Sequence, residues 1–564
     1  MLVVVVLGVA GGRAPAAPAP EVRLDRPFVV TQIPAGTDLE KRPPLAAGTL
    51  RVPYGEGGRL LLVAPDGTTR VLSEGFHSAC DPEVSFDAAR LLFAGKRAAA
   101  DAWNVFEMQA DGTGVRQVTR DHGDCRQPAY QATLYTLDSP QPWYQVTFVS
   151  NAAGTMDEYG AAVATHLYSC KLDGSALRRL TFTISGDVDP FLMADGRLLL
   201  ASWQRFGLDR GLAGRVALFG VGIDGTDYAV LAADEGRRVK HMPCTTTRGL
   251  AVFVESDAVG WDGAGRLACV ALRRPLHSYR PITDDGDGLF HTPSPLPDGQ
   301  ILVSRRPSDG SGTHGVWRLD PATGRRELVF DDPAWHDIQA RLIHPRPEAD
   351  GRSTVVAEKD PHGKLYCLNV YLSDVEPSGG MPPGSVKRLR VLEGVPAKAG
   401  QAGAYLPAGG KYPAGATVRG IPPLVQRRIL GEIDVEEDGS FNVEVPADTP
   451  IQLQVLDADG MALRSSAWIW AKNHEPRGCI GCHEDGELTP ENTFVQAMTR
   501  PSVVLALPAE RRRTVDFRRD VLPIVSGKCV SCHRAGGPPP HLDGGPAPAG
   551  GAGAKAPFSR AYEA

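Results

Sequence analysis

Several common signatures are missing from this sequence of 564 residues. Lysine and arginine number 60 against 66 aspartates and glutamates, a formal net charge of −6, so the composition predicts no basic surface for a phosphate backbone. No stretch approaches the roughly 18 apolar residues that a membrane-spanning helix needs. The GxxxxGK[ST], HExxH and GxSxG motifs are absent. We therefore expect no nucleic-acid partner, no stable membrane span, and neither kinase nor hydrolase chemistry.

Glycine and proline are plentiful. The 63 glycines and 47 prolines make up about a fifth of the chain, a mixture typical of many short strands joined by turns. At about 100 to 200 residues per domain, the length predicts three or four domains. We predict a mainly β fold: an N-terminal β-propeller, a small β-sandwich middle domain, and small C-terminal haem segments with short helices.

The propeller prediction rests on internal repeats between residues 50 and 345. Repeated Asp-Gly turns, each followed by a short strand, lie about 45 to 62 residues apart, which is typical of four-stranded blades. These turns begin at Asp66, Asp111, Asp173 and Asp224. The repeats resemble β-propellers of the TolB type and predict about six blades within residues 22–350.

A different pattern, simple alternation of apolar and polar residues, follows in the predicted middle domain, 351–510. It predicts half-buried antiparallel strands on both sides of a turn at 437–439. We expect a small β-sandwich built from the segments 354–356, 365–371, 433–435, 441–445 and 453–455.

Four of the ten cysteines lie in two CxxCH motifs. Two thiols three positions apart can form thioethers to one haem, and the adjacent histidine can bind its iron. At this composition one such motif is expected by chance roughly 0.005 times. The sequence therefore predicts two covalent c-type haems, with axial iron ligands His483 and His533. The attachment residues are Cys479, Cys482, His483, Cys529, Cys532 and His533. The alternative is a zinc site, which would not require a histidine after both cysteine pairs.

Candidates for the distal iron ligands are less well defined by the sequence. His474 and Met498 lie near the first motif and His541 near the second. Each also has a structural interpretation: His474 as a loop residue, Met498 as a core residue of a short helix, and His541 as part of a tail rich in proline and glycine.

The N-terminus has the pattern of an export signal. Residues 2–10 are apolar, and a small-residue cleavage site follows at 14–16, although no lysine or arginine precedes the apolar run. We expect a signal peptide and linker over 1–21 and a periplasmic or otherwise exported protein. Export is also what haem thioether attachment requires in most bacteria, and it would permit disulfides among the remaining six cysteines.

Three His-x-x-Cys pairs precede successive blades, at His77, His122 and His241. If the following strand is innermost, these pairs gather at one mouth of the propeller channel and could bind an additional metal or dock a haem domain. The simpler interpretation is a disulfide between Cys80 and Cys125, with polar residues lining a wet channel. Further polar residues occur at similar positions within the repeats: Asp81, Asp124, Asp187, Asp189, His291 and His336.

Short motifs along most of the chain resemble known families. The segments 436–441, 445–447, 456–460, 464–465 and 481–484 resemble the middle domain of the hydrazine synthase alpha subunit family. The upstream repeats, with Trp103-Asn104 and 191–196, are similar to the N-terminal domain of that family. Residues 515–524, before Cys529, resemble the haem domains of planctomycete-type cytochromes c.

The resemblance implies one subunit of a multi-subunit haem complex, in which the first haem is the open, reactive site and the second relays electrons. Members of the family continue beyond the last residue, so we expect the second haem domain, 511–564, to be truncated. Two functions remain open. The main interpretation is an exported dihaem cytochrome that passes single electrons to a redox partner, with the propeller as docking scaffold. The alternative is a haem-based redox enzyme subunit acting on small nitrogen compounds. A third, weaker interpretation is a propeller binding module in which haem is structural or sensory.

Overall fold

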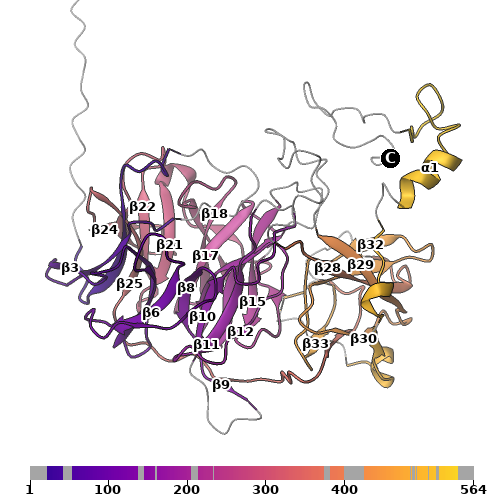
Figure 1. Ribbon diagram of the computed structural model, residues 1–564, viewed down its shortest axis with the longest axis horizontal. Coiled ribbons are helices and arrows are strands. Elements are labelled where there is room, and N and C mark those ends of the chain that lie inside the picture. Colours follow the sequence, from indigo (N-terminus) through magenta and orange to yellow (C-terminus); the bar gives the residue numbers. More distant parts are fainter. Residues whose placement is uncertain are drawn as a thin grey trace, which may run out of the picture.

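The structure is a computed structural model. It describes residues 22–41, 54–136, 145–158, 162–204, 214–232, 234–373, 381–398, 425–482, 484–485, 489–490, 492–505, 507–515 and 520–543. The predicted signal peptide, 1–21, lies outside the described residues, as does His483. Two β-rich bodies lie side by side, with the single α-helix of the described residues, α1 (Leu522–Lys528), beyond the second body (Figure 1).

The first body is a six-bladed β-propeller, as the repeats predicted. Each blade has its innermost strand at the channel, and the following strands lie progressively further out. The first three blades are β25 (Trp335–Leu342), β1 (Phe28–Pro34), β2 (Arg59–Val63) and β3 (Thr69–Val71); β4 (Ser78–Val84), β5 (Arg90–Lys96), β6 (Asn104–Gln109) and β7 (Arg116–Gln117); and β8 (Cys125–Tyr130), β10 (Gln145–Ser150), β11 (His166–Lys171) and β12 (Arg178–Arg179).

The other three blades follow in chain order. They are β13 (Asp187–Leu192), β14 (Arg197–Gln204), β15 (Arg215–Gly222) and β16 (Ala229–Val230); β17 (Val239–Thr245), β18 (Leu250–Ser256), β19 (Arg266–Ala271) and β20 (Arg280–Pro281); and β21 (Leu289–Pro295), β22 (Ile301–Arg306), β23 (Gly315–Leu319) and β24 (Arg326–Phe330). A 3₁₀ turn, η2 (Asp285–Asp287), precedes β21. Each innermost strand contacts the innermost strand of the next blade, and β25 closes the ring by pairing with β1.

Every innermost strand contains a β-bulge at the same height. The bulged residue has a left-handed backbone, with φ between 41° and 59°, although none of the six is a glycine. Such a conformation costs about 1 to 3 kcal/mol unless surrounding contacts hold it in place. The six residues are Asp81, Gln127, Asp189, Met242, Thr292 and Gln339. Because their spacing follows the blades, they form a ring around the channel, and we call them the bulge ring.

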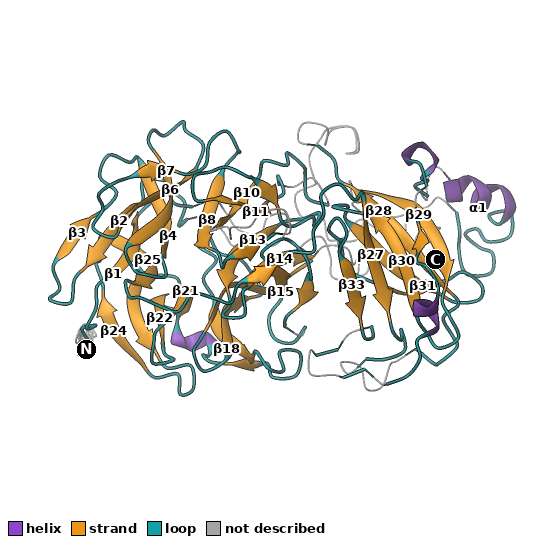
Figure 2. Cartoon of the chain, turned by 90° about the horizontal axis from the view of Figure 1, so that it is seen from below, coloured by secondary structure: helices purple, strands orange, loops and turns teal. Residues whose placement is uncertain are grey.

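The second body is the predicted β-sandwich. One sheet has the order β33 (Pro476–Cys479), β27 (His362–Cys367), β30 (Phe441–Pro446) and β34 (Val503–Val504). The other has the order β29 (Gln426–Asp434), β28 (Arg388–Val395), β31 (Ile451–Leu456) and β32 (Ala462–Ser465). Figure 2 shows these strands beside the propeller. A shared apolar core, which includes Leu389, Val443 and Ile451, lies between the sheets.

Two details of the predicted sandwich were wrong. The strands on either side of the turn at 437–439 do not pair with each other: β29 joins one sheet and β30 the other, so this turn is a corner between sheets. Residues 354–356 also contribute no strand. Instead β26 (Arg352–Ser353) pairs with β9 (Leu134–Tyr135), which ties the linker after the propeller to the propeller itself.

Short helices complete the described chain. They are η4 (Gln496–Thr499), η5 (Ala509–Arg511) and α1. Within the described residues, no helix has the length and apolar character needed to cross a bilayer.

The propeller and the sandwich share buried side chains. Trp470, which precedes β33, belongs to the largest apolar cluster of the propeller, and its ring centroid lies 4.2 Å from that of Tyr228. Its indole N–H donates to the carbonyl oxygen of Gly225 at 3.0 Å. A fully buried tryptophan of this size contributes strongly to an interface. The chain segment that leads into the first CxxCH motif is therefore fixed against the propeller.

Candidate haem-attachment sites

The first CxxCH motif begins at the end of β33, an edge strand of the sandwich. β33 runs parallel to β27, and this places Cys479 beside Cys367. As whole residues, Cys479 is exposed and Cys482 is half-buried, whereas Cys367 is buried; burial raises the pKa of both the Cys367 and the Cys479 thiol. The two cysteines of the motif are thus the more exposed residues of this group, which favours thioether formation there.

Backbone contacts fix the loop between these two cysteines. The Cys482 N–H donates to the Leu372 carbonyl oxygen at 2.7 Å, and a Cβ atom on Gly481 would lie 2.3 Å from the same oxygen. Only glycine fits at that point. On the other side, Glu484 Oε1 accepts hydrogen bonds from the N–H groups of Ile480 (2.9 Å) and Gly481 (3.0 Å). The loop is therefore ordered by protein contacts alone.

Asp485 attaches this loop to the propeller. Its buried Oδ1 accepts a hydrogen bond from Leu276 N–H at 2.9 Å, in the loop between β19 and β20. Its Oδ2 lies 3.7 Å from both Arg274 Nε and His277 Nε2. Sequence reasoning missed Asp485, although the acidic pair 484–485 directly after the motif was a usable signal. The contact makes the propeller a direct support of the first motif.

The two distal-ligand candidates near this motif lie in different places. His474 is exposed at the opposite end of β33 from Cys479, and its Nδ1 lies 2.9 Å from Asp360 Oδ2. Met498 lies in η4 and is 46% exposed. Two backbone N–H groups of η4 donate to side chains of the sandwich: Gln496 to Asp438 at 2.8 Å and Ala497 to Ser440 at 3.0 Å. Leu372 lies at the same end of the sandwich. Of the two, Met498 shares that end of the sandwich with the first motif.

The second CxxCH motif follows α1. The Cys529 N–H donates to the Val525 carbonyl oxygen at 2.9 Å, and the His533 N–H donates to the Cys529 carbonyl oxygen at 2.9 Å, so the motif continues the helical turns. His533 Nδ1 lies 3.1 Å from the Pro540 carbonyl oxygen. A histidine that donates its Nδ1–H to a backbone carbonyl presents Nε2 to a metal. This geometry fits an axial haem ligand.

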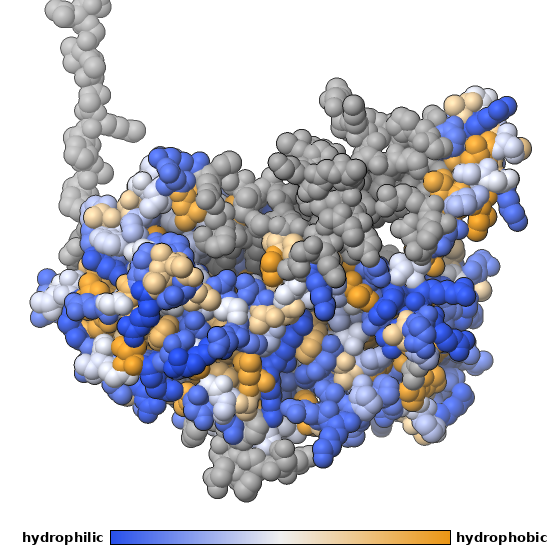
Figure 3. All heavy atoms as spheres, viewed as in Figure 1, coloured by the Kyte–Doolittle hydropathy of each residue, from blue (hydrophilic) through white to orange (hydrophobic). Residues whose placement is uncertain are grey.

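The surroundings of the second motif also fit a flat apolar group. Ile524 on α1 is 58% exposed, and Figure 3 shows apolar surface around α1. The third distal candidate, His541, lies beside Pro540, with its Nε2 3.1 Å from the Gly537 carbonyl oxygen. That contact engages the nitrogen that would otherwise be presented to iron.

The three histidines at the propeller mouth have separate surroundings. His77 Nδ1 lies 2.8 Å from Ser78 Oγ, His122 packs edge-on against Tyr168, and the buried His241 Nε2 lies 2.8 Å from the Gly263 carbonyl oxygen. Burial lowers the pKa of His122. Among the described residues, no group of three or more His, Cys, Asp or Glu side chains is placed to hold a metal ion.

The predicted disulfide between Cys80 and Cys125 was wrong. All ten cysteines are described and none forms a disulfide. Cys80 packs with Ala94 and Trp103, whereas Cys125 packs in a separate apolar cluster with Phe148. Burial raises the pKa of Cys80 and raises that of Cys125 to about 11, so both remain protonated thiols inside the propeller.

A buried polar group lies at the same end of the propeller, and of its three members the sequence indicated His336 alone. His314 Nδ1 lies 3.0 Å from His336 Nδ1, and His314 Nε2 lies 3.1 Å from Asp262 Oδ2. Burial is the main cause of the lowered pKa values of both histidines, and that of His336 falls to about 4. Both imidazoles are therefore neutral near pH 7 and contribute hydrogen bonds rather than charge.

Comparison with known proteins identifies the middle of the chain. Residues 384–484 match the family model described as the hydrazine synthase alpha subunit middle domain. The chain is also 26% identical over 634 aligned residues to hydrazine synthase subunit alpha of Kuenenia stuttgartiensis, covering 87% of this chain and 76% of that protein.

One solved structure supports the fold of the whole chain. The hydrazine synthase structure of Kuenenia stuttgartiensis matches with a TM-score of 0.74 and 24% identity, over 97% of this chain and 85% of the other. TolB from Acinetobacter baumannii matches with a TM-score of 0.39 and 12% identity, over 57% of this chain and 67% of the other. The class is thus a β-propeller joined to a β-sandwich. The particular resemblance, to the hydrazine synthase alpha subunit family, is confirmed.

Proposed function

We propose that this chain is a haem-bearing, alpha-type subunit of an exported redox enzyme complex that acts on small nitrogen compounds. One observation carries the proposal: the match to the hydrazine synthase alpha middle domain ends at residue 484, so it contains the whole first CxxCH motif. The same observation favours the enzyme subunit over a single-electron carrier, which was the main prediction from the sequence.

Cys479 and Cys482 would hold the first haem covalently, and His483 would be its axial ligand. A bound haem supplies an iron centre that can take a small ligand and exchange electrons with it. The protein provides the support. Glu484 and Leu372 hold the backbone of the attachment loop, and Asp485 fixes that loop to the propeller.

Cys529, Cys532 and His533 would hold the second haem, for which we propose an electron-relay role. The contact between His533 Nδ1 and the Pro540 carbonyl oxygen supports axial ligation through Nε2, since it orients the imidazole before any metal arrives. The exposed apolar side chain of Ile524 would then be covered by the porphyrin.

Export and assembly follow from the same proposal. Thioether attachment outside the cytoplasm agrees with the N-terminal pattern of 1–21. The relatives are described as a subunit and as a hydrazine synthase, which supports partner subunits for this chain.

The spin state of the haems tests the proposed function. We expect the holoprotein to contain one high-spin haem that binds nitric oxide or carbon monoxide and one low-spin haem that does not. Cys479→Ser with Cys482→Ser should remove the ligand-binding haem, and Cys529→Ser with Cys532→Ser should remove the other. Cys269→Ser, a buried thiol of the propeller, is the control and should keep both. Two low-spin haems, neither binding these gases, would instead support the electron carrier.

A further inference from the structure

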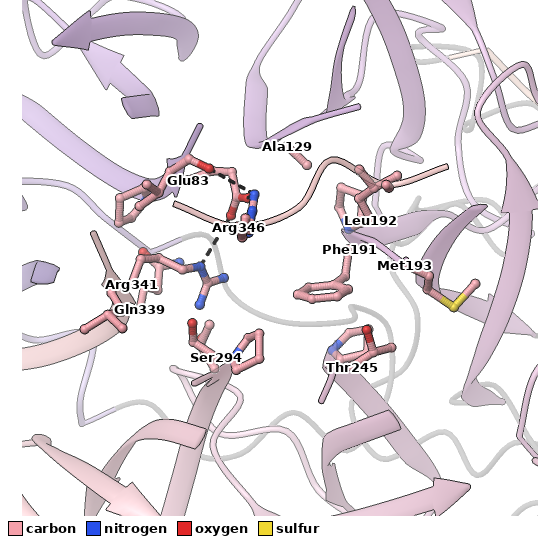
Figure 4. Close-up of a pocket in the computed structure, with 18 of the residues that line it drawn as sticks. Glu83, Ala129, Phe191, Leu192, Met193, Thr245, Ser294, Gln339, Arg341 and Arg346 are labelled. Carbon is pink, nitrogen blue, oxygen red and sulfur yellow. Dashed lines mark hydrogen bonds and ion pairs between the residues drawn. The ribbon is translucent and has the colours of Figure 1, made fainter. Parts of the chain in front are cut away.

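Charged groups in the cavity of the propeller pair with one another. The cavity has a volume of about 340 Å³ and lies against the bulge ring, with Phe191 on one side and Arg341 on the other (Figure 4). Arg346 Nη2 forms an ion pair with Glu83, and Arg341 Nε lies 3.5 Å from the same carboxylate. Arg346 belongs to the linker that leads to the sandwich, so these charges tie the linker to the second blade.

The first CxxCH motif, in contrast, lies beside a third thiol to which the proposed function gives no role. β33 runs parallel to β27, and its last residue, Cys479, is the direct partner of Cys367. The Leu368 N–H donates to the Cys479 carbonyl oxygen at 3.0 Å. One position earlier, a Cβ atom on Gly478 would lie 2.3 Å from Cζ of Tyr366. The two strands are therefore closely packed where the two cysteines meet.

The backbone positions of Cys367 and Cys479 suit a disulfide bond. Directly paired residues of neighbouring strands are about 4.8 Å apart and point to the same face of the sheet. A disulfide joins residues whose Cα atoms are about 4.4 to 6.8 Å apart. The Cys367 thiol also lies against the loop of the motif, since its Sγ is 3.8 Å from the Gly481 carbonyl oxygen. Cys367 is buried in the sandwich core and Cys479 is exposed as a residue, so a small oxidant reaches the pair from the Cys479 side.

We propose that Cys367 and Cys479 form a disulfide in the haem-free chain, and that this bond excludes haem from the first motif. The Cys479 thiolate attacks a small disulfide such as oxidised glutathione, forms a mixed disulfide and releases one glutathione thiol. The Cys367 thiolate then attacks the Cys479 sulfur and releases the second glutathione thiol. The two protein thiols are oxidised, and the two electrons and two protons that they lose reduce the glutathione disulfide to two thiols.

The disulfide and the first haem exclude each other because both use the sulfur of Cys479. A thioether to haem forms from a free thiol, which the disulfide removes. This consequence rests on the proposed function, whereas the disulfide itself does not. The second motif is an internal comparison, since Cys367 is the one cysteine of the sequence that lies neither in a CxxCH motif nor in a propeller strand.

Peptide mass spectrometry of the haem-free full chain tests the disulfide. Burial raises the pKa of both thiols, so the chain is incubated with oxidised glutathione at about pH 8.5 to supply thiolate. Free thiols are then blocked and the chain is digested with trypsin. We expect the peptide 365–387 to be joined to the peptide 478–511. Cys482→Ser should keep this link, whereas Cys479→Ser should lose it.

Cys125 and Cys170 are the matched control. Both thiols are buried in one apolar cluster, but β10 lies between their strands, so they are too far apart to bond. The proposal is overturned if Cys367 and Cys479 are joined no more often than this pair. It is also overturned if Cys479 joins Cys482 instead, or if Cys479→Ser keeps the link. The wild-type chain decides the first two points without any variant.

The distribution of haem between the two motifs tests the exclusion. The wild type and Cys367→Ala, which keeps a small apolar side chain in the core, are matured in an exporting host with oxidised glutathione in the medium. We expect Cys367→Ala to raise the ratio of haem on the first motif to haem on the second, as measured by peptide mass spectrometry. An unchanged ratio would overturn the exclusion. Haem missing from the first motif in both chains, even without the oxidant, would contradict the proposed function, while the peptide link would still decide the disulfide.

Discussion

Gln339 and Asp81 bind each other through two hydrogen bonds. The amide nitrogen of Gln339 donates to Asp81 Oδ1 at 2.6 Å, and its amide oxygen accepts from the Asp81 backbone N–H at 2.9 Å. The two residues are 258 positions apart in sequence and lie on β25 and β4, in adjacent blades. They join the last strand of the propeller to the blade that follows it around the ring.

Removing this contact should destabilise the propeller. Gln339→Ala leaves the buried N–H of Asp81 and the buried Thr31 hydroxyl without their acceptor, and it leaves Asp81 Oδ1 with only the longer contact to Arg126 Nη2 at 3.4 Å. We therefore expect the free energy of unfolding to fall by about 3 kcal/mol. Urea unfolding of the full chain followed by tryptophan fluorescence measures this loss. Gln300→Ala, which removes a contact with Arg318 near the surface, should cost less than about 1 kcal/mol. Equal losses would mean that the contact does not stabilise the ring.

Gly481 should be required for haem attachment at the first motif but not at the second. In Gly481→Ala, the new Cβ would overlap the Leu372 carbonyl oxygen, so the loop could not hold the two cysteines in place. We expect the variant to carry haem on the second motif alone. The control is Gly527→Ala in α1, where a Cβ meets no atom within 4 Å, and this variant should carry both haems. Peptide mass spectrometry assigns each haem to its motif.

Asp485 should determine the rigidity of the contact between the motif and the propeller. Asp485→Ala removes the acceptor of Leu276 N–H, so hydrogen exchange should speed up at both 274–278 and 479–485. Asp309→Ala, which removes the acceptor of Ser311 N–H in another propeller turn, should affect its own turn alone. If hydrogen exchange in Asp485→Ala speeds up at 479–485 but not at 274–278, the propeller does not support the motif.

Acid should destabilise the propeller through its buried histidines. Burial lowers the pKa of His166 to about 4 and that of His336 to about 4. Both are neutral in the native state near pH 7, whereas the unfolded chain binds protons below about pH 6.5. Stability is therefore complete above pH 6.5 and is lost as the pH falls towards 4, by up to about 3 kcal/mol for each histidine.

Urea unfolding between pH 7 and pH 4.5 measures this loss. His166→Gln, which cannot take up a proton, should flatten the dependence, and His77→Gln at the surface should leave it unchanged. If His166→Gln leaves the dependence of stability on pH unaltered, the acid destabilisation does not come from His166.

The sequence predicted those parts of the fold that depend on local chemistry. The Asp-Gly turns marked the blades because each aspartate caps its own turn, as Asp111 Oδ1 does by accepting from Thr113 N–H at 2.9 Å. The alternation in the middle domain predicted strands because each of these strands buries one face. The CxxCH spacing predicts haem attachment at these cysteines, which stays a prediction, and the structure places the first motif at the end of an edge strand.

The parts that depend on distant partners could not be predicted. The turn at 437–439 does not specify which sheet each flanking strand joins, since both β29 and β30 bury an apolar face in the same core. The bulge ring requires contacts between blades, such as that of Gln127 with Asp189, 62 positions apart. The Cys80–Cys125 disulfide was wrong because sequence spacing does not show that the two thiols pack in separate clusters.

Intact-mass spectrometry of the protein matured with a functioning haem-attachment system tests the central claim most directly. The account predicts a chain that carries the mass of two covalent haems, with one lost when Cys479 and Cys482 are changed to serine and the other lost when Cys529 and Cys532 are changed. A chain of unmodified mass, or one that holds zinc at these cysteines, would contradict it.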